Sequence, residues 1–195
     1  MFNRTTFFIR EHVGMLKLSD TYDILDPATQ AQLGIAKEKP GALIHVLRLI
    51  VNKRMLPTTV NVFEGDSHEN DSKRLFSIKR RFSLIRPKVE ILDRQGNKIG
   101  YFKSKLISIG PSFMVFDTAD NQVAQIKGDW KGWNFQLLDK NEKEIGSVTK
   151  KWAGVGKELF TSADNYVIAL PDQADKNISM LLLAAGLAID IVYKE

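Results

Sequence analysis

The densest group of residues that could bind a ligand lies between residues 73 and 88, in the basic segment KRLFSIKRRFSLIRPK. Its lysines and arginines alternate with apolar residues, so in a strand Lys79 and Arg81 face one side and Arg80 the other. Such a surface suits phosphates or anionic lipid headgroups. A solvated strand face that binds nothing is the simpler alternative. If the segment binds anions, we expect the contacts to come from Lys79, Arg80, Arg81, Arg86 and Lys88.

A second basic group belongs to a predicted amphipathic helix at about 42–55, ALIHVLRLIVNKRM, which follows Pro40-Gly41. Its apolar residues cover a broad face, and its polar stripe is narrow. Cations at its C-terminal end suit the helix dipole. The helix either packs on one end of a sheet or lies on a membrane surface. In the second case Arg48, Lys53 and Arg54 add to the anion-binding residues.

The sequence contains no recognisable catalytic or metal-binding motif. The histidines at positions 12, 45 and 68 lie far apart and have no metal-ligand spacing. The acidic loop at 64–73, EGDSHENDSK, reads as a solvated loop. Gly154-Val155-Gly156-Lys157 lacks the first glycine of a phosphate loop, and Glu158 stands where Ser or Thr is needed. We therefore predict a protein that is not an enzyme and needs no cofactor.

The elements that would position the basic residues are hairpins of one repeated design. Four segments, 22–39, 89–106, 113–130 and 135–152, each contain an alternating strand that ends in an apolar pair followed by Asp. A polar turn, an apolar residue and then Gly or Ala follow, before a second strand. Asp closes such a turn with its side chain, and the small residue permits a bend or close packing. The repeat predicts an antiparallel meander in which Asp26, Asp93, Asp117 and Asp139 form turns.

The apolar face of such a sheet must pack against another element, and the C-terminal stretch NISMLLLAAGLAIDIVY at 177–193 is the candidate. Its apolar residues lie on all faces of a helical wheel, which indicates a helix buried in protein or in a membrane. The run is shorter than the about 20 apolar residues of a spanning helix, and it carries Asp190. We predict a buried central helix at about 175–192, with a membrane anchor as the alternative. Its expected core residues are Leu182, Leu183, Ala185, Leu187 and Ile189, with Gly186 at a close approach to the strands.

Composition agrees with one folded domain spanning residues 1–195. The chain has a net charge of +5, 44% hydrophobic residues and no cysteine. The absence of cysteine excludes disulfides and thiol chemistry, and it fits a reducing compartment. The first residues lack the apolar core of a signal peptide, so we expect a cytoplasmic protein. No nucleic-acid-binding motif is present, and we expect no nucleic-acid partner.

A family resemblance rests on residues 145–194. An ordered set runs through Ile145-Gly146, Lys150, Trp152, Gly154, Glu158-Leu159-Phe160-Thr161, Ala163-Asp164-Asn165-Tyr166, Leu170-Pro171 and the apolar helix ending Ala188-Ile189-Asp190. This set is similar to the C-terminal half of phospholipid scramblases, and residues 7–26 resemble the related LURP-one family. Both resemblances imply a mainly β (α+β) fold: a closed, antiparallel, tubby-like β-barrel of about twelve strands around one buried C-terminal helix. The amphipathic helix at 42–55 would be an addition to this barrel.

The resemblance also implies a calcium-responsive, membrane-associated protein, but the calcium loop departs from the family pattern. The loop aligns with residues 162–173, where Ser162 and Gln173 replace acidic ligands and Val167 stands where a calcium loop needs glycine. Asp164 and Asp172 remain as a weak, degenerate candidate. We therefore predict that no calcium binds.

Together these observations predict a scramblase-like or LURP-one-like protein that associates with anionic phospholipid headgroups, peripherally at a membrane surface. The alternative is a soluble protein-interaction or signalling module of tubby-like fold with a protein partner and no membrane role.

Overall fold

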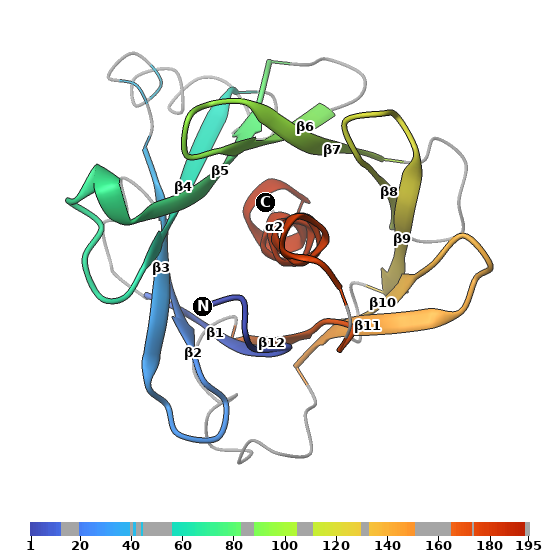
Figure 1. Ribbon diagram of the computed structural model, residues 1–195, viewed down its shortest axis with the longest axis horizontal. Helices are drawn as coiled ribbons and strands as arrows, with labels where there is room; N and C mark the ends of the chain where they lie inside the picture. The colour runs from blue at the N-terminus through green and yellow to red at the C-terminus, as the bar shows by residue number, and fades with distance from the viewer. Residues whose placement is uncertain are drawn as a thin grey trace.

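The chain forms a closed barrel of twelve antiparallel strands around one helix, as the computed structural model in Figure 1 shows. Each strand pairs with its neighbours in sequence, and β1 closes the ring against β12. The strands are β1 Thr6–Glu11, β2 Thr21–Leu25, β3 Gln32–Glu38, β4 Thr58–Glu64, β5 Arg74–Arg80, β6 Lys88–Asp93, β7 Lys98–Ser104, β8 Ser112–Phe116, β9 Gln122–Asp129, β10 Asn134–Leu138, β11 Glu144–Thr149 and β12 Tyr166–Ala169. The 3-10 turn η2 spans Asp71–Lys73, and helix α2 spans Lys176–Tyr193.

The structure describes residues 1–12, 20–39, 41, 44, 56–82, 88–104, 111–129, 133–150, 165–172 and 174–193, with the backbone alone for 191–193. The predicted amphipathic helix at 42–55 lies outside the described residues, except for Ile44. The predicted central helix at about 175–192 agrees with α2 to within one residue at each end. The barrel with its one C-terminal helix confirms the predicted mainly β fold.

The four repeated segments are the hairpins β2–β3, β6–β7, β8–β9 and β10–β11, and their aspartates form the turns as predicted. The Oδ1 atom of Asp117 accepts hydrogen bonds from the backbone N–H groups of Ala119 and Asn121, at 2.8 and 2.9 Å. Asp139 makes the same pair with Asn141 and Lys143. A carboxylate that caps its own turn in this way fixes the hairpin locally, and this explains why one sequence pattern recurs four times.

The small residue of the return strand permits close packing, and Gly100 in β7 shows why. A Cβ atom at this position would lie 2.4 Å from the carbonyl oxygen of Phe116 in β8 and 2.5 Å from Leu181 of the central helix. No side chain fits there unless the backbone moves. Next to it, the β6–β7 register shifts between Ile91 and Leu92, so the hairpin bends around the helix at this point.

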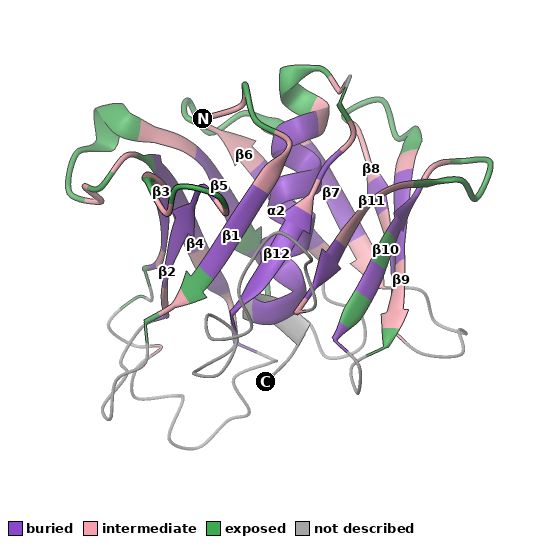
Figure 2. Ribbon diagram, turned by 90° about the horizontal axis from the view of Figure 1, so that it is seen from below, coloured by how far each residue is buried: buried purple, intermediate pink, exposed green. Residues whose placement is uncertain are grey.

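Helix α2 runs through the centre of the barrel: its residues 179–190 are buried, whereas its first turn is exposed at the rim (Figure 2). The five residues predicted to line the core are at most 2% exposed: Leu182, Leu183, Ala185, Leu187 and Ile189. A Cβ atom at Gly186 would lie 2.7 Å from Ile168 of β12, which confirms the predicted close approach. The helix begins after Asp175, whose Oδ1 accepts hydrogen bonds from the N–H groups of Asn177 and Ile178. Among the described residues, no helix has the length and apolar character that crossing a membrane requires.

The C-terminal end of α2 carries one acidic residue into the barrel interior. Asp190 is only 3% exposed. Burial raises the pKa of its carboxyl group to about 7, and the nearby Glu11 carboxylate acts in the same direction. The Tyr22 hydroxyl opposes the rise by hydrogen bonding to Asp190. This end of the core therefore holds an ionisable group, while the rest of the helix packs through apolar side chains.

Candidate anion-binding surface

The predicted basic segment forms strand β5 and the residues that follow it. Lys79 is exposed on the outer face of β5, Arg81 is exposed just beyond its end, and Lys88 begins β6 on the same outer face. These three residues meet the expectation of a basic surface on the outside of the sheet. Four other predicted contacts, Arg48, Lys53, Arg54 and Arg86, lie outside the described residues.

Arg80 does not share this surface, and the prediction that it contacts headgroups there is corrected. Strand alternation turns Arg80 away from Lys79 and Arg81, and only 3% of the residue is exposed. Its Nε atom donates a hydrogen bond to the carbonyl oxygen of Leu56 at 3.2 Å. Arg80 therefore holds the segment before β4 against the barrel, and its guanidinium does not face solvent.

Strand β7 brings two further lysines to the outer face, and they gather around one aromatic ring. The Nζ atoms of Lys88, Lys98 and Lys103 lie 4.2, 5.3 and 5.0 Å from the centroid of the Tyr101 ring. The ring itself stacks on Phe116 of β8, with centroids 5.0 Å apart. We call Lys88, Lys98 and Lys103 with Tyr101 the lysine cluster, and the same cluster together with Lys79 and Arg81 the basic face.

The lysine cluster concentrates positive charge where strand pairing alone would disfavour it. Lys88 and Lys103 are direct partners across the β6–β7 ladder. Like charges opposite each other destabilise a sheet, but the face of an aromatic ring attracts cations and reduces that cost. The Tyr101 hydroxyl donates a hydrogen bond to Asp120 at 2.9 Å, and burial with this contact raises the pKa of the phenol. The ring therefore stays neutral and keeps attracting ammonium groups at physiological pH.

Among the described residues, Glu90 is the carboxylate that forms ion pairs with cations of the basic face. Glu90 of β6 contacts Arg81 at 3.1 Å and Lys88 at 3.9 Å. The five cations of the basic face, Lys79, Arg81, Lys88, Lys98 and Lys103, therefore exceed the negative charge of Glu90. Such a convex surface with excess positive charge can bind several phosphate groups of an anionic surface.

Sequence reasoning missed Tyr101, Lys98 and Lys103. They belong to the second hairpin segment, 89–106, which the repeat explained as structure alone. The alternation in Lys98–Ser104 already placed Tyr101 and Lys103 on one face of a strand. The neighbour relation to Lys88 needed the β6–β7 register, which shifts at the bulge.

The described residues contain no group of three or more His, Asp or Glu side chains that could hold a metal ion. Asp172 is exposed between β12 and α2, whereas Asp164, its partner in the weak calcium candidate, lies outside the described residues. His12 contacts Asp23 at 2.9 Å, His68 contacts Lys37, and His45 is not described. These histidines therefore take part in separate local contacts.

Comparison with known proteins gives one family. The scramblase family model matches residues 20–195. A phospholipid scramblase family protein of Schizosaccharomyces pombe is 23% identical over an alignment that covers 91% of this chain and 49% of that protein. Human phospholipid scramblase family member 5 is 26% identical over 55% of this chain and 42% of its own length. Bovine phospholipid scramblase 2 is 27% identical over 58% and 41%, respectively. The chain thus spans half or less of these relatives, and no solved structure gives a significant match.

Proposed function

The chain belongs to the scramblase family, and from this premise we propose that it is a non-enzymatic, cytoplasmic protein that associates peripherally with anionic phospholipid headgroups. The contact surface is the basic face on strands β5, β6 and β7. The observation that carries the proposal is the lysine cluster, in which three ammonium groups lie within 5.3 Å of one ring centroid. The Tyr101 ring and Glu90 offset only part of the repulsion among these lysines, and an anion bound at the surface would offset more of it.

An exposed aromatic side chain beside the basic face supports the same function. Phe82 follows Arg81 directly and is 58% exposed, which makes it the one exposed large apolar side chain among the described residues. Aromatic residues partition into the interfacial region of a bilayer, where adjacent cations can meet phosphates. Phe82 therefore fits an anchor that enters the headgroup layer while Arg81 and the lysines remain at its surface.

The experiment is sedimentation with vesicles of neutral and of anionic composition, at low and high salt, with calcium and with chelator. We expect binding to anionic vesicles that weakens with salt, because Debye screening shortens the reach of surface charges. Calcium should make no difference. The Lys88→Ala/Lys103→Ala variant should bind about 30-fold more weakly, since each lysine near an anionic membrane contributes about 1 kcal/mol.

The matched control removes two charges from another part of the barrel. Lys140 and Lys143 are exposed in the β10–β11 turn, which Figure 1 places on a different side of the barrel from β5 and β6. The Lys140→Ala/Lys143→Ala variant should bind nearly as well as the wild type. If both double variants lose the same affinity for anionic vesicles, binding depends only on the net charge of the protein. That result would refute the basic face as the site. If no vesicle binds under any condition, the alternative of a protein-interaction module without a membrane role replaces the proposal.

A further inference from the structure

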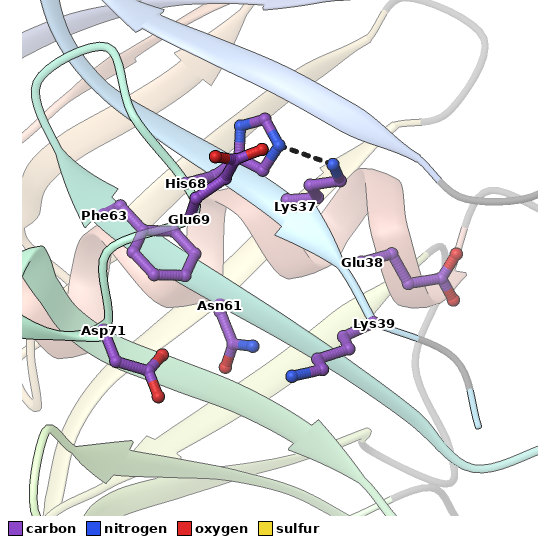
Figure 3. A pocket seen from close by; sticks show the side chains of 8 residues that line it. All are labelled: Lys37, Glu38, Lys39, Asn61, Phe63, His68, Glu69 and Asp71. Carbon is purple, nitrogen blue, oxygen red and sulfur yellow. Dashed lines mark hydrogen bonds between the residues drawn. The ribbon is translucent and has the colours of Figure 1, made fainter.

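A pocket of about 430 Å³ lies on the outer face of the barrel over β3 and β4. It adjoins the basic face, because its residues Lys39 and Asn61 also line a neighbouring pocket with Lys79. Strand register builds its floor: Lys37 of β3 and Asn61 of β4 are direct partners, and Asn61 in turn pairs with Ser77 of β5. The segment between β4 and β5 folds over this floor and contributes the remaining wall, as Figure 3 shows. The lining residues are Lys37, Glu38, Lys39, Asn61, Phe63, His68, Glu69 and Asp71.

The floor of the pocket contains an amide group with a free donor, Asn61. Asn61 is 8% exposed, and its Oδ1 atom accepts a hydrogen bond from the Ser77 hydroxyl at 2.7 Å. No described residue accepts a hydrogen bond from the Asn61 Nδ2 atom. Figure 3 shows this amide nitrogen turned toward the Lys39 side of the pocket. The Nδ2 atom is open to the solvent of the pocket, so a ligand acceptor placed here can replace water as its hydrogen-bond partner.

The two ends of the pocket carry opposite charges. Lys39 lies on one side of Asn61, whereas Asp71 and the ring of Phe63 lie on the other. The Lys39 ammonium makes no hydrogen bond or ion pair with a described residue, and Asp71 has only a long contact to Arg74, at 3.7 Å. Glu69 adds a second exposed carboxylate to the wall. An anion near Lys39 and Asn61, with a cation near Asp71 and the Phe63 ring, would match both ends.

The remaining polar side chains of the pocket are engaged. The Lys37 Nζ atom lies 2.6 Å from the His68 Nε2 atom. An ammonium group can only donate, so the Nε2 atom is the acceptor in this contact. Glu38 is buried and its carboxylate accepts hydrogen bonds from the Thr58 hydroxyl and from the Asp20 backbone N–H group. Two lysines and two free carboxylates therefore face the cavity, which disfavours a polyanion.

We infer that this pocket binds a small zwitterion, in which a phosphate or carboxylate group and an ammonium group are joined by a short chain. The volume suits a compound of this size, within the range of small-molecule sites. The same chemistry occurs in a free compound and in a phospholipid headgroup that bears an amine. The inference is argued from other residues than the membrane proposal, since the pocket and the basic face share no residue, although Lys79 of the basic face lines a neighbouring pocket with Lys39 and Asn61.

The test is isothermal titration calorimetry. The full chain is titrated separately with O-phosphoethanolamine, with inorganic phosphate and with ethanolamine. We expect O-phosphoethanolamine to bind with the highest affinity of the three. Lys39→Ala should weaken it about tenfold or more, as the loss of a charge-assisted hydrogen bond does. Asp71→Asn should remove the preference for O-phosphoethanolamine over phosphate, while binding of phosphate itself remains. Lys140→Ala, a distant exposed lysine, is the control and should change nothing.

A second arm identifies the source of the ligand. Vesicles of phosphatidylcholine with and without phosphatidylethanolamine are compared in the wild type and in Lys39→Ala. Binding of the free compound alone assigns a free metabolite to the pocket. Binding of both the free compound and phosphatidylethanolamine vesicles, each weakened by Lys39→Ala, assigns a lipid headgroup. No saturable binding of O-phosphoethanolamine, or binding that Lys39→Ala and Asp71→Asn leave unchanged, overturns the inference.

Discussion

Replacing Asp190 with asparagine should change how the stability of this protein depends on pH. The carboxyl group lies at the C-terminal end of α2 and is 3% exposed. The ionisable groups that influence it come from several elements: Glu11 of β1, Tyr22 of β2, Asp20 before it, and Lys150 after β11. Asparagine has nearly the same shape and can still accept the hydrogen bond from Tyr22, so the substitution removes the charge with little change in packing.

The size of the effect follows from the difference between the folded and unfolded pKa values. Burial, reinforced by Glu11, raises the pKa of Asp190 from its usual 3.8 to about 7 in the folded state. Between these values the folded protein holds a proton that the unfolded chain has released. Stability from this group is therefore fully present below the unfolded pKa and is lost as pH rises to about 7. About three pKa units at 1.36 kcal/mol each give a loss of about 4 kcal/mol.

The assay is urea denaturation of the wild type and of Asp190→Asn between pH 4 and pH 8. At pH 4 the two proteins should have similar free energies of unfolding. At pH 8 the variant should be the more stable by a difference approaching about 4 kcal/mol, because asparagine cannot ionise. Other titrating groups are common to both proteins and cancel in the difference. Asp172→Asn, at an exposed site, is the control and should change stability little. A stability difference that stays constant from pH 4 to pH 8 would refute the reasoning.

Three further substitutions test the packing and the hairpins, each by chemical denaturation. Leu183→Asp should unfold the protein, because an unpaired carboxylate at a side chain that is 0% exposed costs several kcal/mol; a folded variant contradicts the buried helix. Gly100→Ala should cost about 1–3 kcal/mol, since its Cβ would lie 2.4 Å from the Phe116 carbonyl oxygen and 2.5 Å from Leu181. An unchanged midpoint would mean that this part of the barrel relaxes freely. Asp139→Ala should cost about 1 kcal/mol through the loss of its turn hydrogen bonds, and a neutral result would remove the aspartates as turn formers.

The sequence predicted the hairpins and the central helix because their signals are local, whereas the closed twelve-stranded barrel was expected from the family resemblance. Asp117 and Asp139 accept hydrogen bonds from backbone groups two to four residues away. Such turns can therefore be predicted from the local sequence, without tertiary information. The central helix was equally clear, because a run with apolar residues on every face has to be enclosed. Leu183 and Gly186 followed from that enclosure, since a helix inside a barrel contacts strands on all sides.

The candidate site was predicted only in part, for a physical reason. Lys79 and Arg81 were found because they are neighbours in sequence. Arg80 was included with them, although its place on the other side of the strand buries it. A list of basic residues does not show which of them face the interior of a closed sheet.

The sequence by itself determined the elements of this protein: the hairpins, their turns, the central helix and the family. Only the tertiary structure decided which side chains act together. Lys88 and Lys103 meet over Tyr101 because the β6–β7 register, which shifts at the bulge between Ile91 and Leu92, makes them direct partners. Lys39 and Asp71 line one pocket because the segment after β4 folds back over β3 and β4. Both arrangements depend on strand register and chain reversal. Because these bring distant residues together, they cannot be read from local patterns of polarity.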